Sequence, residues 1–163
     1  MNNPKIDTKE LARFLVKAKT NAWAADEKEI EPQRPGFKEL EFNDGDWNYR
    51  DSYTGYFCAP GQEIVRYQNI PVWAMAYDGG MAEPFMEDRN LAKKTFAFLK
   101  RALMSVTEEE PFRGPSNLKD GAEWIYSNRF LGDIERFKGE EKIMNNGSLV
   151  FSQNYIGGLI SHK

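Results

Sequence analysis

GQEIVRYQNIPVWAMAYDGGM, residues 61–81, is the stretch that decides the fold, because the chain contains it twice. It aligns without a gap on residues 139–159, GEEKIMNNGSLVFSQNYIGGL, at a shift of 139 − 61 = 78 residues. Six of the 21 positions are identical, whereas average composition would give about one. Upstream, Trp47 aligns with Trp124 at a shift of 124 − 47 = 77. Self-similarity of this kind is typical of a duplicated unit. We therefore expect a single domain, residues 1–163, built from an internal duplication over about 8–81 and about 84–160.

Each repeat is predicted to hold one helix followed by three strands. Asp7 and Glu10 form a capping box ahead of apolar residues at helical spacing, which predicts a helix over residues 8–23. Pro84 marks the start of the second helix. Apolar and alternating runs predict strands at 46–53, 63–67, 72–77, 123–130, 141–144 and 149–155. Polar stretches rich in Pro and Gly predict long loops at 26–45 and 107–121, the first with a short strand at 40–42. The predicted fold class is α+β, with two pseudo-symmetric repeats of helix plus three antiparallel strands.

Composition excludes several classes of protein. A chain of 163 residues with 40% hydrophobic content is long enough to bury a core. A net charge of −3 and a pI near 5.4 predict neither direct nucleic-acid binding nor attraction to an anionic membrane. No apolar run is long enough to span a bilayer, and the first ten residues lack the apolar core of a signal peptide. Cys58 is the only cysteine, so no intrachain disulfide can form. We expect a cytoplasmic protein.

No catalytic signature is present in the sequence. His162 is the only histidine and lies next to the C-terminal residue, which argues against histidine-based catalysis and a multi-histidine metal site. Gly79 and Gly80 lack the spacing of a phosphate-binding loop. We therefore predict no catalytic residue, no metal and no cofactor, and we lean towards a protein that is not an enzyme.

Glu63 and Glu141 are the strongest candidates for a functional site, because they occupy the same position in the two repeats. If the repeats meet along a seam, both carboxylates would face one cleft lined by aromatic side chains. Such a pocket suits a small organic ligand, in particular a cationic one, through charge pairing and cation–π attraction. The predicted ligand-binding residues are Glu63, Glu141, Trp47, Tyr49, Trp73, Tyr77, Trp124, Tyr126 and Tyr155.

Three alternatives remain open at this point. The glutamates could be structural anchors that pair with an arginine such as Arg34 or Arg113. They could instead form the acid/base pair of a carboxylate-based enzyme, together with Asp51. Exposed aromatic residues could form a protein-interaction surface or a homodimer interface.

Several motifs taken together resemble a bacterial family known as domain of unknown function 5680. They include Arg34-Pro35-Gly36, Gly61-Gln62-Glu63, Pro71-Val72-Trp73 and the closing Tyr155-x-Gly157-Gly158-Leu159-Ile160, within Leu11 to Ile160. The resemblance implies an established domain and no known reaction. It also implies an association with transcriptional regulators, since some members carry an Xre-type helix-turn-helix. Few residues precede the first predicted helix, so we expect no such DNA-binding module here. Sensing of a small molecule is the function we expect.

Overall fold

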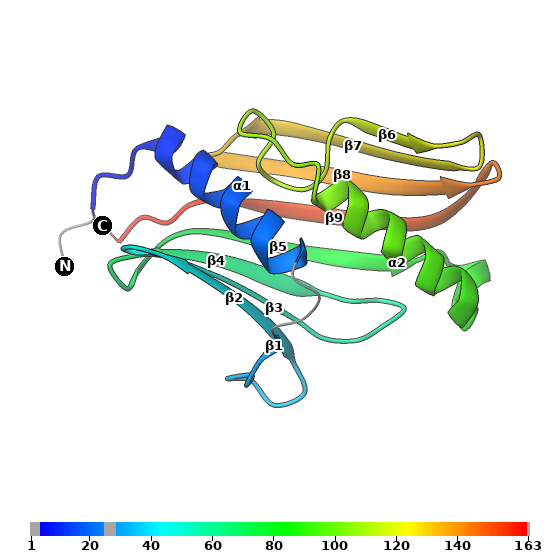
Figure 1. The fold of residues 1–163 in the computed structure, drawn as a ribbon, viewed down its shortest axis with the longest axis horizontal. Coiled ribbons are helices and arrows are strands. Elements are labelled where there is room, and N and C mark those ends of the chain that lie inside the picture. The colour runs from blue at the N-terminus through cyan, green and yellow to red at the C-terminus, as the bar shows by residue number, and fades with distance from the viewer. Residues whose placement is uncertain (1–3, 25–28, 163) are drawn as a thin grey trace.

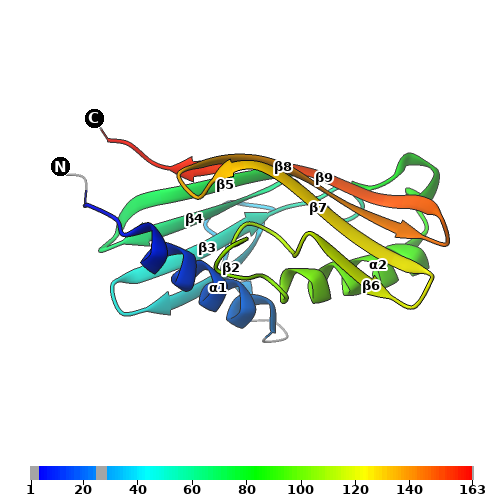
Figure 2. The same cartoon turned by 90° about the horizontal axis from the view of Figure 1, so that it is seen from above.

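One antiparallel sheet organises the molecule. The computed structural model describes residues 4–24 and 29–162, and within them nine strands pair in the order β1-β2-β3-β4-β5-β9-β8-β7-β6. Two α-helices, α1 and α2, lie on the same side of this sheet, which bends around them (Figures 1 and 2). The remaining face of the sheet carries no helix in the described part of the chain.

The elements follow each other in two similar series. The first series is α1 Thr8–Ala24, β1 Glu29–Ile30, β2 Lys38–Asp44, β3 Trp47–Tyr53, β4 Gly61–Tyr67 and β5 Ile70–Met81. After a short 3-10 helix, η1 Glu83–Phe85, the second series is α2 Arg89–Leu103, β6 Asn117–Asp120, β7 Trp124–Asp133, β8 Arg136–Asn145 and β9 Ser148–Leu159.

The prediction of two repeats of a helix plus three strands is wrong. The strands form one continuous sheet. The first predicted loop, 26–45, contains β1 and the whole of β2, of which only 40–42 was expected, and the second predicted loop contains β6; residues 25–28 lie outside the described part. β2 is mostly polar, yet it pairs with β3 over seven residues. Its acids Glu39 and Glu41 are neutralised across the ladder by Arg50, at 3.3 and 2.9 Å. Backbone pairing and cross-strand charges thus stabilise a strand whose apolar residues are Leu40 and Phe42 alone.

β5 and β9 join the two halves of the sheet at its centre. Each is 12 residues long, and they pair antiparallel with Tyr77 opposite Tyr155. Trp73 lies opposite Leu159, and Met81 opposite Phe151. Phe151 is the repeat equivalent of Trp73, because 73 + 78 = 151, and Leu159 is the repeat equivalent of Met81, because 81 + 78 = 159. Each residue of one pair therefore has its repeat equivalent in the other pair. The register is the one that a twofold-related pair would have, while the duplication itself stays a prediction.

Both helices begin at an aspartate and bury one face against the sheet. Asp7 accepts hydrogen bonds from the backbone N–H groups of Lys9 and Glu10, at 2.8 and 3.3 Å, which confirms the predicted N-cap of α1. Asp88 accepts from the N–H of Leu91 at 2.9 Å and caps α2. Pro84 lies in η1 and not in α2, so the predicted start of the second helix was too early.

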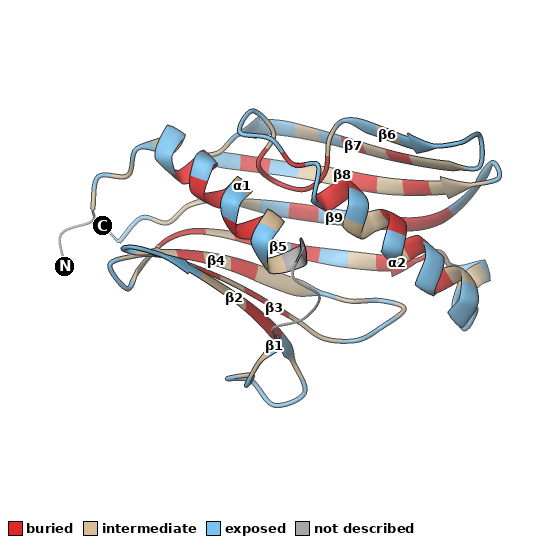
Figure 3. Cartoon of the chain, in the orientation of Figure 1, coloured by how far each residue is buried: buried red, intermediate tan, exposed pale blue. Residues whose placement is uncertain are grey.

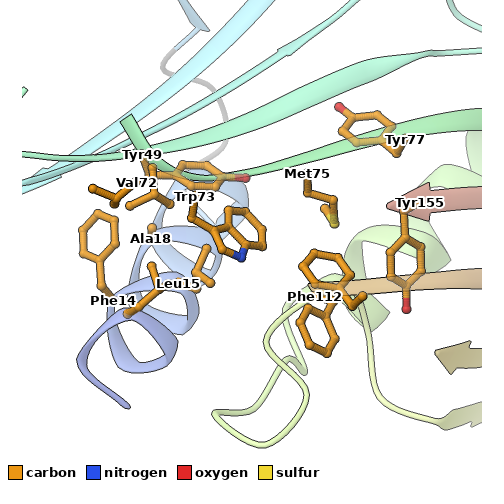
Figure 4. Packing of buried hydrophobic residues seen from close by; sticks show 13 residues of the cluster. Phe14, Leu15, Ala18, Tyr49, Val72, Trp73, Met75, Tyr77, Phe112 and Tyr155 are labelled. Atoms are coloured by element: carbon orange, nitrogen blue, oxygen red, sulfur yellow. The ribbon is translucent and has the colours of Figure 1, made fainter. Parts of the chain in front are cut away.

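The core lies between the helices and the sheet, where buried positions recur along every central strand (Figure 3). Phe14, Leu15 and Ala18 of α1 pack beneath Val72 and Trp73 of β5 (Figure 4). A second cluster joins α2 to β7, β8 and β9 around Phe98, Tyr126 and Phe151. Among the described residues, neither helix has the length and apolar character needed to cross a membrane.

Candidate functional site

Arg113 links the two predicted glutamates in the interior. Its Nε donates to Oε1 of Glu141 at 2.8 Å, and its Nη1 lies 3.4 Å from Oε1 of Glu63. All three side chains are at most 4% exposed. Burial acts to lower the pKa of Arg113, but the carboxylates of Glu141 and Glu63 outweigh it and raise the pKa above its usual value. Glu63 and Glu141 therefore share one buried cation, Arg113.

Lys19 of α1 supplies the second cation. Its Nζ lies 2.7 Å from Oε2 of Glu63 and also donates to the carbonyl oxygen of Phe112. Burial lowers the pKa of Lys19, and the charge of Arg113 adds to this effect, whereas Glu63 opposes it. Sequence reasoning missed Lys19. The signal was its position on the apolar face of the helix, four residues after Leu15.

Glu141 is also surrounded by neutral donors. The hydroxyl of Tyr126 donates to its Oε2 at 2.7 Å, and Nε2 of Gln153 donates to its Oε1 at 2.8 Å. Burial, followed by the charge of Glu141, raises the pKa of Tyr126 far above its usual value, so the hydroxyl keeps its proton. With Arg113 included, Glu141 accepts three hydrogen bonds, which fixes its orientation.

Asp51 is the one acid of this buried group that contacts no cation directly in the described part of the chain. It lies on β3 opposite Glu63 and accepts a 2.7 Å hydrogen bond from the Tyr77 hydroxyl at Oδ1. Its Oδ2 has no hydrogen-bond partner among the described residues. Burial and the nearby charge of Glu63 raise the pKa of Asp51 to about 7. Asp51 therefore changes charge near neutral pH.

The second half of the sheet repeats this hydrogen bond with an amide. Tyr155 donates to Oδ1 of Asn128 at 2.7 Å, and Asn128 lies opposite Glu141, as Asp51 lies opposite Glu63. Asn128 in turn donates to the carbonyl oxygen of Gly114 at 2.9 Å and so fixes the loop that carries Arg113. The two halves thus share one geometry but differ in charge.

Glycines lie beneath both tyrosine rings. A Cβ atom on Gly61 would approach the Tyr77 hydroxyl oxygen to 2.3 Å, and one on Gly139 would approach the Tyr155 ring to 2.3 Å. Both distances are below van der Waals contact, so only glycine fits where the rings lie flat on the strand. The repeated Gly-x-Glu of the sequence therefore places a ring over the glycine and a carboxylate two residues later on the same face.

The other predicted residues separate into two groups. Tyr49 and Trp73 are fully buried, and Nζ of Lys19 lies 5.9 Å from the centre of the Trp73 ring. Trp47 stacks on Phe14 in one core cluster, whereas Trp124 packs on Phe98 in the other. The structure therefore brings Glu63 and Glu141 together with Tyr77, Tyr126 and Tyr155, but not with the two outer tryptophans. Of the two candidate anchoring arginines, Arg113 contacts the glutamates, whereas Arg34 lies 3.3 Å from Gln62.

A cavity of about 190 Å³ opens beside this network, beneath α2. Tyr77, Arg113 and Gln153 form the wall that it shares with the network. The other lining residues come from α2, from the β3–β4 connection and from neighbouring strands: Lys38, Tyr53, Gly55, Tyr56, Ala59, Gly80, Phe96, Leu99, Lys100, Leu103 and Phe151. Residues buried in the network therefore reach a space that a small molecule could occupy.

A larger groove of about 1050 Å³ lies on the helix-free face of the sheet, over β5, β7, β8 and β9. Its most exposed apolar side chains are Leu131, 68% exposed, and Ile156, 61% exposed. Around them the groove carries two acids, Asp78 and Glu140, and two bases, Arg129 and Lys138.

The charges of the buried network compensate each other. Lys19 and Arg113 match Glu63 and Glu141, so neither glutamate offers an unpaired negative charge to a ligand. The network is therefore suited to holding Arg113, Tyr77 and Gln153 in fixed orientations at the cavity wall.

Of the comparisons with known proteins, only the one with protein-family models gives a match. No curated protein and no solved structure matches the chain significantly. Residues 51–160 match the family model described as a domain of unknown function, DUF5680. The match covers β4, β5, α2 and the whole second half of the sheet, together with Glu63, Arg113 and Glu141. The chain belongs to the DUF5680 family.

Proposed function

We propose that this chain is a non-catalytic small-molecule-binding module whose ligand occupies the cavity beneath α2. The observation that carries this proposal is the fixed polar wall of the cavity. Arg113 is oriented by Glu63 and Glu141, Tyr77 by Asp51, and Gln153 by Glu141. A largely apolar pocket with a few oriented polar groups is the usual form of a ligand site.

Binding has more support than catalysis by the glutamates. An acid/base or nucleophilic pair needs carboxylates that can reach a substrate and exchange a proton. Glu63 and Glu141 are 1% and 0% exposed and are held by Lys19 and Arg113. Their contacts match those of anchors that orient the cavity wall. The carboxylate-based enzyme stays a sequence-based alternative without a structural observation of its own.

The position of α2 at the cavity supports a role in sensing the bound molecule. Phe96, Leu99, Lys100 and Leu103 of α2 line one side of the cavity, and the sheet lines the other. A ligand would therefore contact both layers and stabilise their packing. Because a ligand that binds only the folded state raises the melting temperature by mass action, occupancy is measurable without knowing the ligand.

The test is a fragment screen by thermal shift, followed by two tryptophan variants on α2. Leu99→Trp adds volume inside the cavity, whereas Ala97→Trp places the same side chain on the exposed face of the same helix. We expect hits with the wild type and with Ala97→Trp, and loss of those hits with Leu99→Trp in a protein that still unfolds cooperatively. Hits that survive Leu99→Trp would place binding elsewhere and contradict the proposal.

A homodimer is a second candidate, supported by the groove on the helix-free face. Leu131 and Ile156 expose apolar surface, and the balanced acids and bases around them allow the same surface on a second copy of the chain to meet it with opposite charges. We expect a concentration-dependent dimer in sedimentation experiments that is lost in Ile156→Lys. A protein that stays monomeric at the highest attainable concentration would contradict it.

A further inference from the structure

The size of the cavity restricts its ligand. A volume of about 190 Å³ is slightly larger than the ~150 Å³ cavity that holds one benzene molecule, and a water in the liquid occupies about 30 Å³. The cavity can therefore take one six-membered ring with a small substituent. Larger ligands such as nucleotides would not fit without movement of α2.

The aromatic walls of the cavity restrict the shape of the ligand. Phe96 makes edge-to-face contacts with Tyr56, at 5.5 Å between ring centres, and with Phe151, at 6.4 Å. All three residues line the cavity, as do Tyr53 and Tyr77. Aromatic walls favour a flat apolar body that can pack face to edge against them.

The charged residues that line the cavity restrict the charge of the ligand. The charged residues among the described lining are Lys38, Lys100 and Arg113, and none of the described lining residues is an acid. The contacts of Arg113 with Glu141 and Glu63 run through Nε and Nη1, so its Nη2 donors take part in neither. The guanidinium lies 4.9 Å from the Tyr77 ring, which also lines the cavity. A carboxylate is the group that planar guanidinium donors recognise best in so small a space.

Resting on the function proposed above, we infer that the ligand is a small aromatic monocarboxylate whose carboxylate faces Arg113. Lys19 supports this assignment, because its Nζ lies 2.7 Å from Glu63 and so gives this carboxylate a cation other than Arg113. Lys38 also lines the cavity, and its ammonium group lies 3.3 Å from Glu29 at the surface. The charge of this ligand is opposite to that of the cationic ligand predicted from the repeated glutamates.

The probes are benzoate, benzamide and benzamidine, which share a ring and a planar substituent of similar size but carry charges of −1, 0 and +1. Each is titrated into the ¹⁵N-labelled full chain at pH 6.5, and amide shifts are followed by NMR. We expect benzoate to shift amides around Gly80, Leu99 and Gln153, and to bind about tenfold more tightly than benzamide, as a charge-assisted hydrogen bond implies. Equal or tighter binding of benzamide or benzamidine would overturn the inference.

Two charge variants separate recognition of the carboxylate from folding. Lys38→Glu reverses a charge at an exposed side chain that lines the cavity, with Lys38→Gln as its neutral control. We expect Lys38→Glu to weaken benzoate severalfold and to leave benzamide unchanged. Arg113→Lys keeps a cation between the glutamates but removes the planar donors, so it should abolish the preference for benzoate over benzamide. If Arg113→Lys does not fold, Lys38→Glu decides alone, and unchanged benzoate binding there contradicts the inference.

Failure of this inference differs from failure of the proposed function. If other fragments bind in a way that Leu99→Trp abolishes, but benzoate shows no preference, the cavity is a ligand site for another class of molecule. If no compound binds in a way that depends on Leu99, both proposals fail.

Discussion

The hydroxyl of Tyr77 on β5 donates a 2.7 Å hydrogen bond to Asp51 on β3, across the intervening strand β4. The corresponding bond in the other half, from Tyr155 to Asn128, has the same length. The first pair therefore includes a carboxyl group that titrates near neutral pH, whereas the second has an uncharged amide in its place. This difference lies at the wall of the cavity, because Tyr77 lines it.

Asp51→Asn should stabilise the protein at alkaline pH. The pKa of Asp51 is about 7 in the folded chain, against about 3.9 when unfolded. Because the folded pKa is the higher one, the folded state holds the proton more tightly, and stability falls as pH rises from about 4 to 7. The cost above pH 7 is on the order of 4 kcal/mol, from about three pKa units. An asparagine at position 51 removes this cost, because it carries no charge at any of these pH values. Asn128, which accepts from Tyr155, shows that an amide fits the same hydrogen bond.

Urea denaturation at pH 5.5 and pH 8 checks this expectation. All other titrating groups are shared by wild type and variant, so the difference between their pH slopes isolates Asp51. We expect Asp51→Asn to gain stability relative to the wild type between the two pH values. Parallel slopes would mean that Asp51 is ionised in the fold at both.

Glu141→Gln should destabilise the fold by about 3–5 kcal/mol, the usual effect of breaking a buried ion pair. Arg113 would keep only Glu63, at 3.4 Å, as a carboxylate partner among the described residues. Its neighbour Glu140 provides the control, because it is 42% exposed and pairs with Lys142 at the surface. Chemical denaturation of Glu140→Gln should give a change of about 0–1 kcal/mol. Similar losses for both variants would show that the buried network contributes no more than a surface pair.

Gly61→Ala should destabilise the protein by about 1–3 kcal/mol, the range for an overpacked core, since the new methyl group would lie 2.3 Å from the Tyr77 hydroxyl oxygen. The same change in a Tyr77→Leu background should cost less, because the ring is no longer present. A double-mutant cycle measures this coupling. Additive effects of the two changes would refute the close approach of ring and strand.

Cys58 should react slowly with iodoacetamide although it is exposed. Partial burial raises the pKa of the thiol, and so does the charge of Asp78, whose Oδ1 accepts from Sγ at 3.7 Å. Asp78→Asn should therefore increase the alkylation rate severalfold at pH 8, because more of the thiol is ionised. Rates in concentrated urea, where the environment is lost, should be equal for the two proteins. An unchanged rate in the folded variant would contradict the role of Asp78.

Local sequence determined the elements with strong local signals. Asp7 caps α1, and the repeated stretch places β5 and β9 at the same 78-residue shift. Asn146-Gly147 joins β8 to β9 with positive φ at both residues, the conformation that an Asn-Gly pair favours between two strands. The polar strand β2 was predicted only as a fragment at 40–42, and β6 was missed. Both depend on a neighbouring strand for their hydrogen bonds, which no local pattern records.

The sequence by itself therefore predicted both helices and most of the strands, and it singled out Glu63 and Glu141 by their matching positions in the repeated stretch. The tertiary structure decided that the strands form one sheet, and that a cation lies between the glutamates. Glu63 and Arg113 are 50 residues apart, and Lys19 lies on a helix 63 − 19 = 44 residues before Glu63. Burying two carboxylates requires compensating charge, but sequence spacing does not tell which distant cation provides it. Only the packing of α1 and of the Arg113 loop against the sheet brings Lys19 and Arg113 to these carboxylates.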